Sequence, residues 1–347
     1  MRNFEEVLHD WLSREAPDRN LQQPFGVPMV LCSDIGIKRR QNQDRVAAMA
    51  VPQNKIGGGL FCLAVSDGMG GMLGGAECAA LTLSGFFAAL LESRGKKLIE
   101  RALLAVEYVN KEVYDSYGGK GGATLSAIVQ DTSGDAFVIN VGDSRVYSLG
   151  KGGVERLTID DSMAEALGAQ GRELLQFIGM GEGIQPHIDP LPRNNNIFII
   201  TSDGVHYIEP KIFDSVIINS GNMRQMAERL SALSRWCGGQ DNSTLAAVDI
   251  SEVKNKIFQE GRKQIGFWDF FGQLSIPDDA FFLKSRKGVL KEENESIDSE
   301  GKNYNKKKSV KKMERGKGVA ASKEKDGKVQ LDIKLDEEGG ENGKGDS

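Results

Sequence analysis

The sequence predicts an α+β layered domain, and the order of its apolar patterns carries this prediction. Short apolar runs typical of strands come first, two long helical patterns follow, and further strand-like runs come after them. Because a sheet and a helix must each bury an apolar face, this order favours helices packed on sheets. With 347 residues, 39% of them hydrophobic, the chain is long enough for one large domain with extensions, or for two domains.

Each predicted element rests on the spacing of its apolar residues. Short apolar runs bounded by glycine or polar residues predict strands over 28–35, 46–51, 60–65, 123–130, 136–141, 145–149, 197–200 and 245–248. Helical spacing predicts helices over 76–91, 98–113 and 223–236. A short amphipathic helix is expected over residues 3–16, ahead of the core.

Three of the predicted strands lie next to an aspartate. Asp67 ends the run over 60–65, Asp203 follows the run over 197–200, and Asp241 shortly precedes the run over 245–248. One Asp-Gly pair is typical of an ordinary turn, but three acids at the ends of three buried strands can converge on one site. Such a cluster needs a metal ion to neutralise it. Carboxylates, with a glycine carbonyl free to approach, suit Mg²⁺ or Mn²⁺ rather than Zn²⁺.

Six short stretches carry a resemblance to a known family. They are residues 36–44, 67–71, 122–125, 140–145, 202–204 and 241–244, and they lie within about residues 27–250. In this order they resemble the metal-dependent protein phosphatases, the type 2C serine/threonine family, and its bacterial members in particular. The resemblance implies two antiparallel β-sheets stacked face to face, with helices on both outer faces.

The resemblance also implies a role for each matching acid. Asp67 would bridge two Mn²⁺ or Mg²⁺ ions, the Gly68 carbonyl would complete one of them, and Asp203 and Asp241 would hold the other. Asp143, together with Asp203, would help to bind a third and weaker ion. The implied reaction is hydrolysis of phosphoserine and phosphothreonine in proteins by a water that bridges the two ions.

Two further residues have expected roles near the ions. Arg39 is the candidate phosphate clamp, because its planar guanidinium can bind two phosphate oxygens. Asp44 is expected to support a water on the metal. His206 lies three residues after Asp203, and we expect a structural role for it.

The sequence departs from the family pattern at three places. Gln43 stands where many members have glutamate, which predicts modestly weaker metal binding. Met69 stands where animal members have a histidine, so a water on the metal would have to protonate the leaving group. Between residues 158 and 196, where the family has a flap, the segment looks short and lacks the usual arginine. The stretch 177–179, Phe-Ile-Gly, is the candidate replacement, and substrate selectivity stays open.

Outside the predicted phosphatase domain, residues 27–252, we expect three segments. Residues 1–26 form an N-terminal extension with the short helix, and residues 253–283 form an aromatic-rich extension. That aromatic stretch either caps the catalytic domain or docks a partner. Residues 284–347 are charged and poor in apolar residues, which predicts a disordered tail.

Composition limits the location and the partners. The net charge of -5 argues against a general nucleic-acid binder. No signal-peptide pattern and no apolar run near the length of a membrane span is found, so a cytoplasmic protein without a membrane partner is expected. The four cysteines contain no CxxC pair and are interpreted as buried, reduced thiols: Cys32, Cys62, Cys78 and Cys237.

Two alternatives to a protein phosphatase remain open. One is a catalytically silent relative that binds a phosphoprotein or a kinase, although retention of Asp67, Asp203 and Asp241 argues against it. The other is a phosphatase for a small phosphorylated metabolite, which a short flap would permit. For the leading hypothesis the expected partner is a phosphorylated protein, either a serine/threonine kinase or one of its targets.

Overall fold

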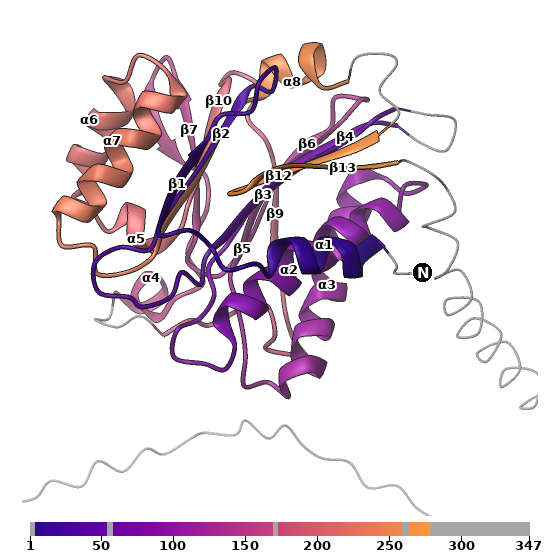
Figure 1. The fold of residues 1–347 in the computed structure, drawn as a ribbon. Coiled ribbons are helices and arrows are strands. Elements are labelled where there is room, and N and C mark those ends of the chain that lie inside the picture. Colours follow the sequence, from indigo (N-terminus) through magenta and orange to yellow (C-terminus); the bar gives the residue numbers. More distant parts are fainter. Residues whose placement is uncertain (1–3, 54–57, 169–172, 259–263, 278–347) are drawn as a thin grey trace, which may run out of the picture. The chain divides into compact units, whose positions relative to one another are not determined.

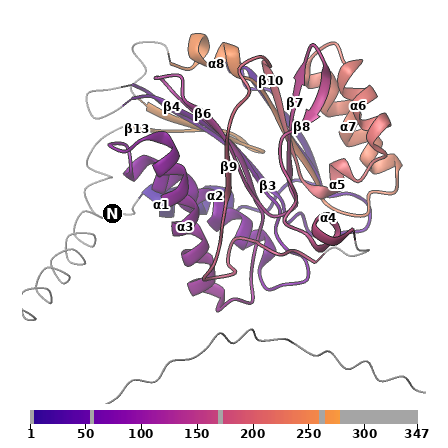
Figure 2. The same ribbon diagram turned by 180° about the vertical axis from the view of Figure 1, so that it is seen from behind.

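The computed structural model describes residues 4–53, 58–168, 173–258 and 264–277. They form two stacked antiparallel sheets with helices on both outer sides, as Figures 1 and 2 show from opposite directions. This is the architecture that the resemblance implied. The chain divides into two units after Leu290, and only the first contains described residues.

The first sheet is built from strands of both halves of the chain. Its order is β1 (Arg19–Gln22), β2 (Met29–Asp34), β11 (Ser243–Asp249), β10 (Ile197–Thr201), β7 (Arg145–Gly150) and β8 (Gly153–Arg156). Its outer side is covered by the helices α5 (Asp203–His206), α6 (Pro210–Ile218) and α7 (Met223–Trp236).

The second sheet lies against the first and has its own helical cover. Its order is β13 (Gly272–Pro277), β12 (Gln264–Asp269), β3 (Arg45–Val51), β4 (Leu60–Ser66), β5 (Leu125–Asp131), β6 (Ala136–Val141) and β9 (His187–Pro190). The helices on its outer side are α1 (Phe4–Leu12), α2 (Gly75–Glu92) and α3 (Leu98–Tyr117). Two short helices, α4 (Met163–Leu167) and α8 (Ile250–Lys256), complete the described elements.

Strand β4 shows why the central strands are apolar throughout. Successive side chains of a strand point to opposite faces. Phe61 and Leu63 therefore enter the core between the two sheets, whereas Leu60 and Cys62 enter the core beneath α2 and α3. Because both faces are buried, the strand has no polar alternation. The run could therefore be recognised as a buried strand from its sequence.

Helix α2 is the one described helix that is long and apolar enough to cross a membrane. The sequence predicted a helix over 76–91 but no apolar run near the length of a membrane span, so this property was missed. In the structure, 78% of the apolar window of Gly75–Glu92 is buried. Its residues pack between the second sheet and its neighbours α1 and α3, so here it acts as a core helix.

The aromatic-rich stretch after residue 252 packs onto the core where it is described. Strand β12 pairs with β3, and Phe267 and Trp268 are almost fully buried. The Phe267 ring lies 5.5 Å from that of Phe4 and 6.2 Å from that of Phe87, between centroids. The two alternatives for this stretch were a cap on the catalytic domain and a docking segment for a partner. Residues 264–277 pack on the core, as the first alternative expects. Phe281, Phe282 and the predicted tail lie outside the described residues.

Among the details that differ from the sequence expectations, three concern α1, β1 and Cys237. Helix α1 spans Phe4–Leu12, which is shorter than the window 3–16. Strand β1 was not predicted, because its polar residues at the sheet edge lack an apolar pattern. Cys237 is exposed at the end of α7, whereas the other three cysteines are buried; all four are free thiols. The interpretation of Cys237 as a buried thiol was therefore wrong.

Candidate metal centre

Asp67 directly follows β4, and its backbone is held from one side. The Thr124 hydroxyl accepts a hydrogen bond from Asp67 N at 3.0 Å, and Thr124 N donates to Asp67 O at 2.8 Å. The same hydroxyl contacts Ser144 Oγ at 2.7 Å. Ser144 belongs to the turn between β6 and β7, where the chain passes from one sheet to the other. Thr124 therefore joins the loop of Asp67 to the turn that carries Asp143.

Asp203 and Asp241 come together because two backbones approach closely. Thr201, at the end of β10, lies opposite Leu245 of β11 and opposite Arg145 of β7. A Cβ atom added to Gly204 would lie 1.9 Å from Asn242 O. Only glycine fits at this contact. The glycine of this Asp-Gly pair thus permits backbone packing, in addition to the carbonyl access that the sequence suggested.

The predicted ligands line one pocket of about 220 Å³. Its walls contain all the residues proposed to bind ions and the proposed phosphate clamp: Arg39, Asp67, Gly68, Asp143, Asp203 and Asp241. In the described part of the chain, no three histidine, cysteine, aspartate or glutamate side chains already meet closely enough to hold one ion together. An ion here would therefore complete its shell with backbone oxygens and water, as Mg²⁺ prefers.

Asp44 lies behind this pocket rather than in its wall. The side chain is fully buried just before β3, and Ser202 Oγ donates a hydrogen bond to Asp44 Oδ2 at 2.8 Å. The pKa of Asp44 is raised to about 7: burial is the largest cause, the hydrogen bonds from Ser202 and Thr244 oppose the shift, and the charges of Asp203 and Asp241 add to it. Because Ser202 precedes Asp203, Asp44 holds the strand end that carries this predicted ligand.

Arg39 reaches the pocket from a loop anchored beside Asp241. Asn242 Nδ2 donates to the carbonyls of Ile35 and Gln41, and Asn242 Oδ1 accepts from Gln43 N. These bonds fix both ends of the loop. The Arg39 guanidinium then donates to Asp241 Oδ2 at 2.6 Å, which raises the pKa of Arg39.

The electrostatics of the pocket favour a bound cation. Burial and then the charges of Asp44 and Asp203 raise the pKa of Asp67 well above its usual range. A group of half-buried carboxylates that repel one another is stabilised by positive charge. The donors are carboxylate oxygens, with the Gly68 backbone beside them, so the residues present fit a hard divalent cation such as Mg²⁺ or Mn²⁺.

Two acidic residues near the pocket were not predicted as part of the site from the sequence. Asp160 accepts hydrogen bonds from Arg145 and Arg156, at 2.7 and 2.6 Å for the shortest pair of each. Asp161 accepts from the backbone of Gly142 at 2.9 Å, and its other oxygen lies 2.9 Å from His187 Nε2. Both hold the short segment after β8 to the turn of Asp143. Their adjacency in the sequence was the only available signal.

The stretch proposed to replace the family's arginine motif has a defined place. Ile178 N donates to Ala123 O at 2.8 Å, and Ala123 N donates to Ile178 O at 3.1 Å. A Cβ atom on Gly122 would lie 2.5 Å from the Phe177 ring. Residues 177–179 therefore pack against the segment beside Asp67. Before them, the segment after β8 contains only the short helix α4 among its described residues.

Comparison with known proteins finds relatives that are named as phosphatases. The serine/threonine protein phosphatase PstP of Mycobacterium tuberculosis is 27% identical over 241 residues, which cover 63% of this chain and 44% of that protein. The chain thus spans less than half the length of this relative. No family model matches the chain.

Two solved structures share the fold. The PPM Ser-Thr phosphatase MsPP from Mycobacterium smegmatis, in complex with cacodylate, has a TM-score of 0.54 and 24% identity, and covers 64% of this chain and 97% of its own. The catalytic domain of PstP in complex with two manganese ions has a TM-score of 0.52 and 23% identity, with 67% and 98% covered.

These likenesses define the class of the fold as that of bacterial serine/threonine phosphatases. A putative 2C-type protein phosphatase of Streptococcus pyogenes is 26% identical over 239 residues, which cover 63% of this chain and 95% of that protein. The resemblance to the type 2C family that the six sequence stretches indicated is thus confirmed in sequence and in fold.

Proposed function

We propose that this protein hydrolyses phosphoserine and phosphothreonine in proteins, with Mn²⁺ or Mg²⁺ as cofactor. The observation that carries the proposal is the pocket that unites Asp67, Asp143, Asp203 and Asp241 with Arg39. The named activity of PstP, 27% identical over 241 residues, supports the same reading.

The residues of the pocket have different roles in the proposed reaction. Asp67, the Gly68 carbonyl, Asp203 and Asp241 would hold two ions, and Asp143 would help with a third. Bound divalent ions would neutralise the phosphoryl oxygens and lower the pKa of the attacking water. Arg39 binds the phosphate of the substrate and orients it. Asp44 keeps Asp203 in place through Ser202.

We infer from the orientation of Arg39 that it binds Asp241 in the absence of substrate and the phosphate in its presence. Its guanidinium lies on Asp241, which is also a predicted ligand. A substrate phosphate, like a carboxylate, can accept hydrogen bonds from the planar guanidinium through two of its oxygens. Binding of substrate would therefore exchange the Asp241 contact for contacts to phosphate, while an ion takes over the neutralisation of Asp241.

The physiological setting follows from the substrate class. We propose a phosphorylated protein as substrate, either a serine/threonine kinase or one of its targets, and a cytoplasmic location. The named activity of the relative is a reason for the first statement.

The deciding experiment is hydrolysis by the full chain of an aryl phosphate, a phosphothreonine peptide and a panel of small phosphorylated metabolites. Each is measured with Mn²⁺, with Mg²⁺ and with a chelator. We expect metal-dependent turnover of the peptide that the chelator abolishes. Turnover of metabolites alone would support a metabolite phosphatase. Binding of the phosphopeptide without any turnover would support a catalytically silent relative.

A further inference from the structure

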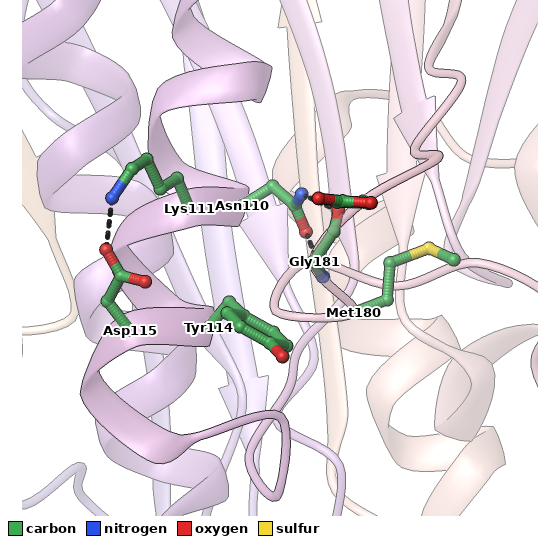
Figure 3. Close-up of a pocket in the computed structure, with 7 residues that line it drawn as sticks. Asn110, Lys111, Tyr114, Asp115, Met180 and Gly181 are labelled. Atoms are coloured by element: carbon green, nitrogen blue, oxygen red, sulfur yellow. Dashed lines mark hydrogen bonds and ion pairs between the residues drawn. The ribbon is translucent and has the colours of Figure 1, made fainter.

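Asn110 is a buried amide on α3 that has no role in the proposed reaction. Its side chain is 5% exposed and points from the helix to the loop around Gly181, as Figure 3 shows. Asn110 Nδ2 donates to Gly181 O at 2.6 Å. Asn110 Oδ1 accepts from Gly179 N at 2.9 Å and from Gly181 N at 3.4 Å. One side chain thus makes three bonds to the backbone of this loop.

The loop can lie on the helix only because of its glycines. Gly179 and Gly181 have φ values of +102° and +88°, a region that L side chains rarely adopt. An added Cβ atom would lie 2.6 Å from the Val113 side chain at Gly179, and 2.8 Å from the Tyr114 ring at Gly181. The close contact with α3 is therefore built into the sequence of the loop.

A ladder of backbone pairs leads from this loop to the predicted metal ligands. Ile178, next to Gly179, exchanges both backbone hydrogen bonds with Ala123. Ala123 in turn lies opposite Gly68 in an antiparallel bridge, in which Thr124 N donates to Asp67 O and Met69 N donates to Gly122 O at 3.0 Å. The position of the Gly68 carbonyl thus depends on the segment around Ala123, which pairs with Ile178 on its other side.

We propose that Asn110 is a positioning residue for the metal centre: by clamping the loop at Gly179 and Gly181, it holds Ile178 and Ala123 and so the backbone of Gly68. The inference rests on the proposed function, since it assumes that Gly68 takes part in a metal site. It assigns to α3, which does not line the metal pocket, a part in metal affinity.

The surroundings of Asn110 explain why loss of its hydrogen bonds would change the metal site. A cleft of about 610 Å³ lies beside it, lined by Asn110, Lys111, Tyr114, Asp115, Met180, Gly181 and Glu182. The cleft leaves room for the loop to move once Asn110 no longer holds it. Removal of the amide would also leave the N–H of Gly179 without its acceptor, which costs free energy in a buried site.

The test is direct titration of the full chain with Mn²⁺, with free Mn²⁺ measured by electron paramagnetic resonance. For Asn110→Ala we expect Mn²⁺ binding weaker by about five-fold or more, within the range for residues that act through a coupled network. Asn110→Asp keeps an acceptor for the Gly179 N–H but cannot donate to Gly181 O, so we expect an intermediate loss. The Mn²⁺ concentration for half-maximal turnover should rise in parallel.

Asn195→Ala is the matched control. Asn195 is also a buried amide, 8% exposed, and donates to Ser148 Oγ at 2.8 Å, but it lines a cleft that shares no residue with the metal pocket. We expect it to lose stability and to bind Mn²⁺ like the wild type. An equal loss of Mn²⁺ affinity in Asn195→Ala would overturn the inference, because the effect would then follow from stability alone.

The other outcomes are also decisive. Wild-type Mn²⁺ affinity in both Asn110 variants would overturn the inference while leaving the proposed function intact. If Asn110→Ala does not fold, Asn110→Asp and Gly181→Ala, which displaces the loop from its own side, decide in its place. A wild-type protein that neither binds Mn²⁺ nor hydrolyses phosphopeptide would reject the proposed function itself, and the inference with it.

Discussion

One end of the β-sandwich carries a pocket of about 220 Å³ lined by four aspartates, and the opposite end carries a cleft of about 590 Å³. The larger cleft has both signs of charge among its side chains, with Asp135, Arg193 and Lys254. The smaller pocket holds four aspartates against one arginine, Arg39, and the pKa of Asp67 is raised by burial and by its neighbours. The clustering of like charges, rather than volume, therefore marks the end that carries the proposed metal site.

The sharpest test of this comparison exchanges one carboxylate at each end. Asp67→Asn should abolish metal-dependent hydrolysis, with a loss of roughly 10³-fold or more, because the predicted bridging charge is removed. Asp135→Asn at the opposite end should leave turnover unchanged. The measurement is kcat with Mn²⁺ for both variants, with circular dichroism to verify folding. Near-normal turnover in Asp67→Asn would break the assignment of the metal end.

A core substitution separates stability from chemistry. Phe267→Ala should lower the free energy of unfolding by about 3–5 kcal/mol, since it removes a buried ring that packs on Phe4 and Phe87. Turnover per folded molecule should stay near that of the wild type. Urea unfolding followed by tryptophan fluorescence measures the first quantity. A stability equal to the wild type would mean that the β12–β13 hairpin does not support the core in solution.

Arg39→Ala tests the phosphate clamp within the metal end. We expect KM for a phosphopeptide to rise roughly ten-fold or more, the scale of a charged hydrogen bond, with a smaller change in kcat. Because the guanidinium also lies on Asp241, its removal should leave Mn²⁺ binding equal or tighter. Steady-state kinetics and a Mn²⁺ titration check the two parts. Weaker Mn²⁺ binding would show that Arg39 supports the ligands instead of competing for one.

The smallest expected effect concerns pH. Burial, then the charges of Arg145 and Arg156, hold the pKa of His206 well below 6.5. The unfolded chain therefore binds this proton at a higher pH than the folded chain, so stability falls as pH drops below about 6.5, by at most about 1.4 kcal/mol per pH unit from one group. His206→Gln should flatten this slope.

Unfolding by urea at several pH values between 7 and 5 measures the slope. Gln can still accept a hydrogen bond at the position where His206 Nδ1 lies 2.8 Å from Thr201 Oγ1, so the contact is retained without the titration. A slope that does not change in His206→Gln would assign the pH dependence to other groups.

The sequence by itself determined the strands that are buried on both faces and the acids at their ends. The run over 60–65 has no polar residue because both of its faces enter a core. Period and composition are local properties, so they are readable without a structure. The pairing of Asp67 with Gly68, and of Asp203 with Gly204, is local in the same sense.

Only the tertiary structure decided which of these residues meet and what holds them. Asn110 reaches Gly181 across 71 residues of chain, and Asp44 reaches Ser202 across 158. Strand β12 joins β3 across more than 200 residues. These contacts depend on register and on the closeness of backbones at Gly179 and Gly204, which no periodicity encodes. Asn110 is an ordinary polar residue in its helix until the loop that it binds is placed beside it.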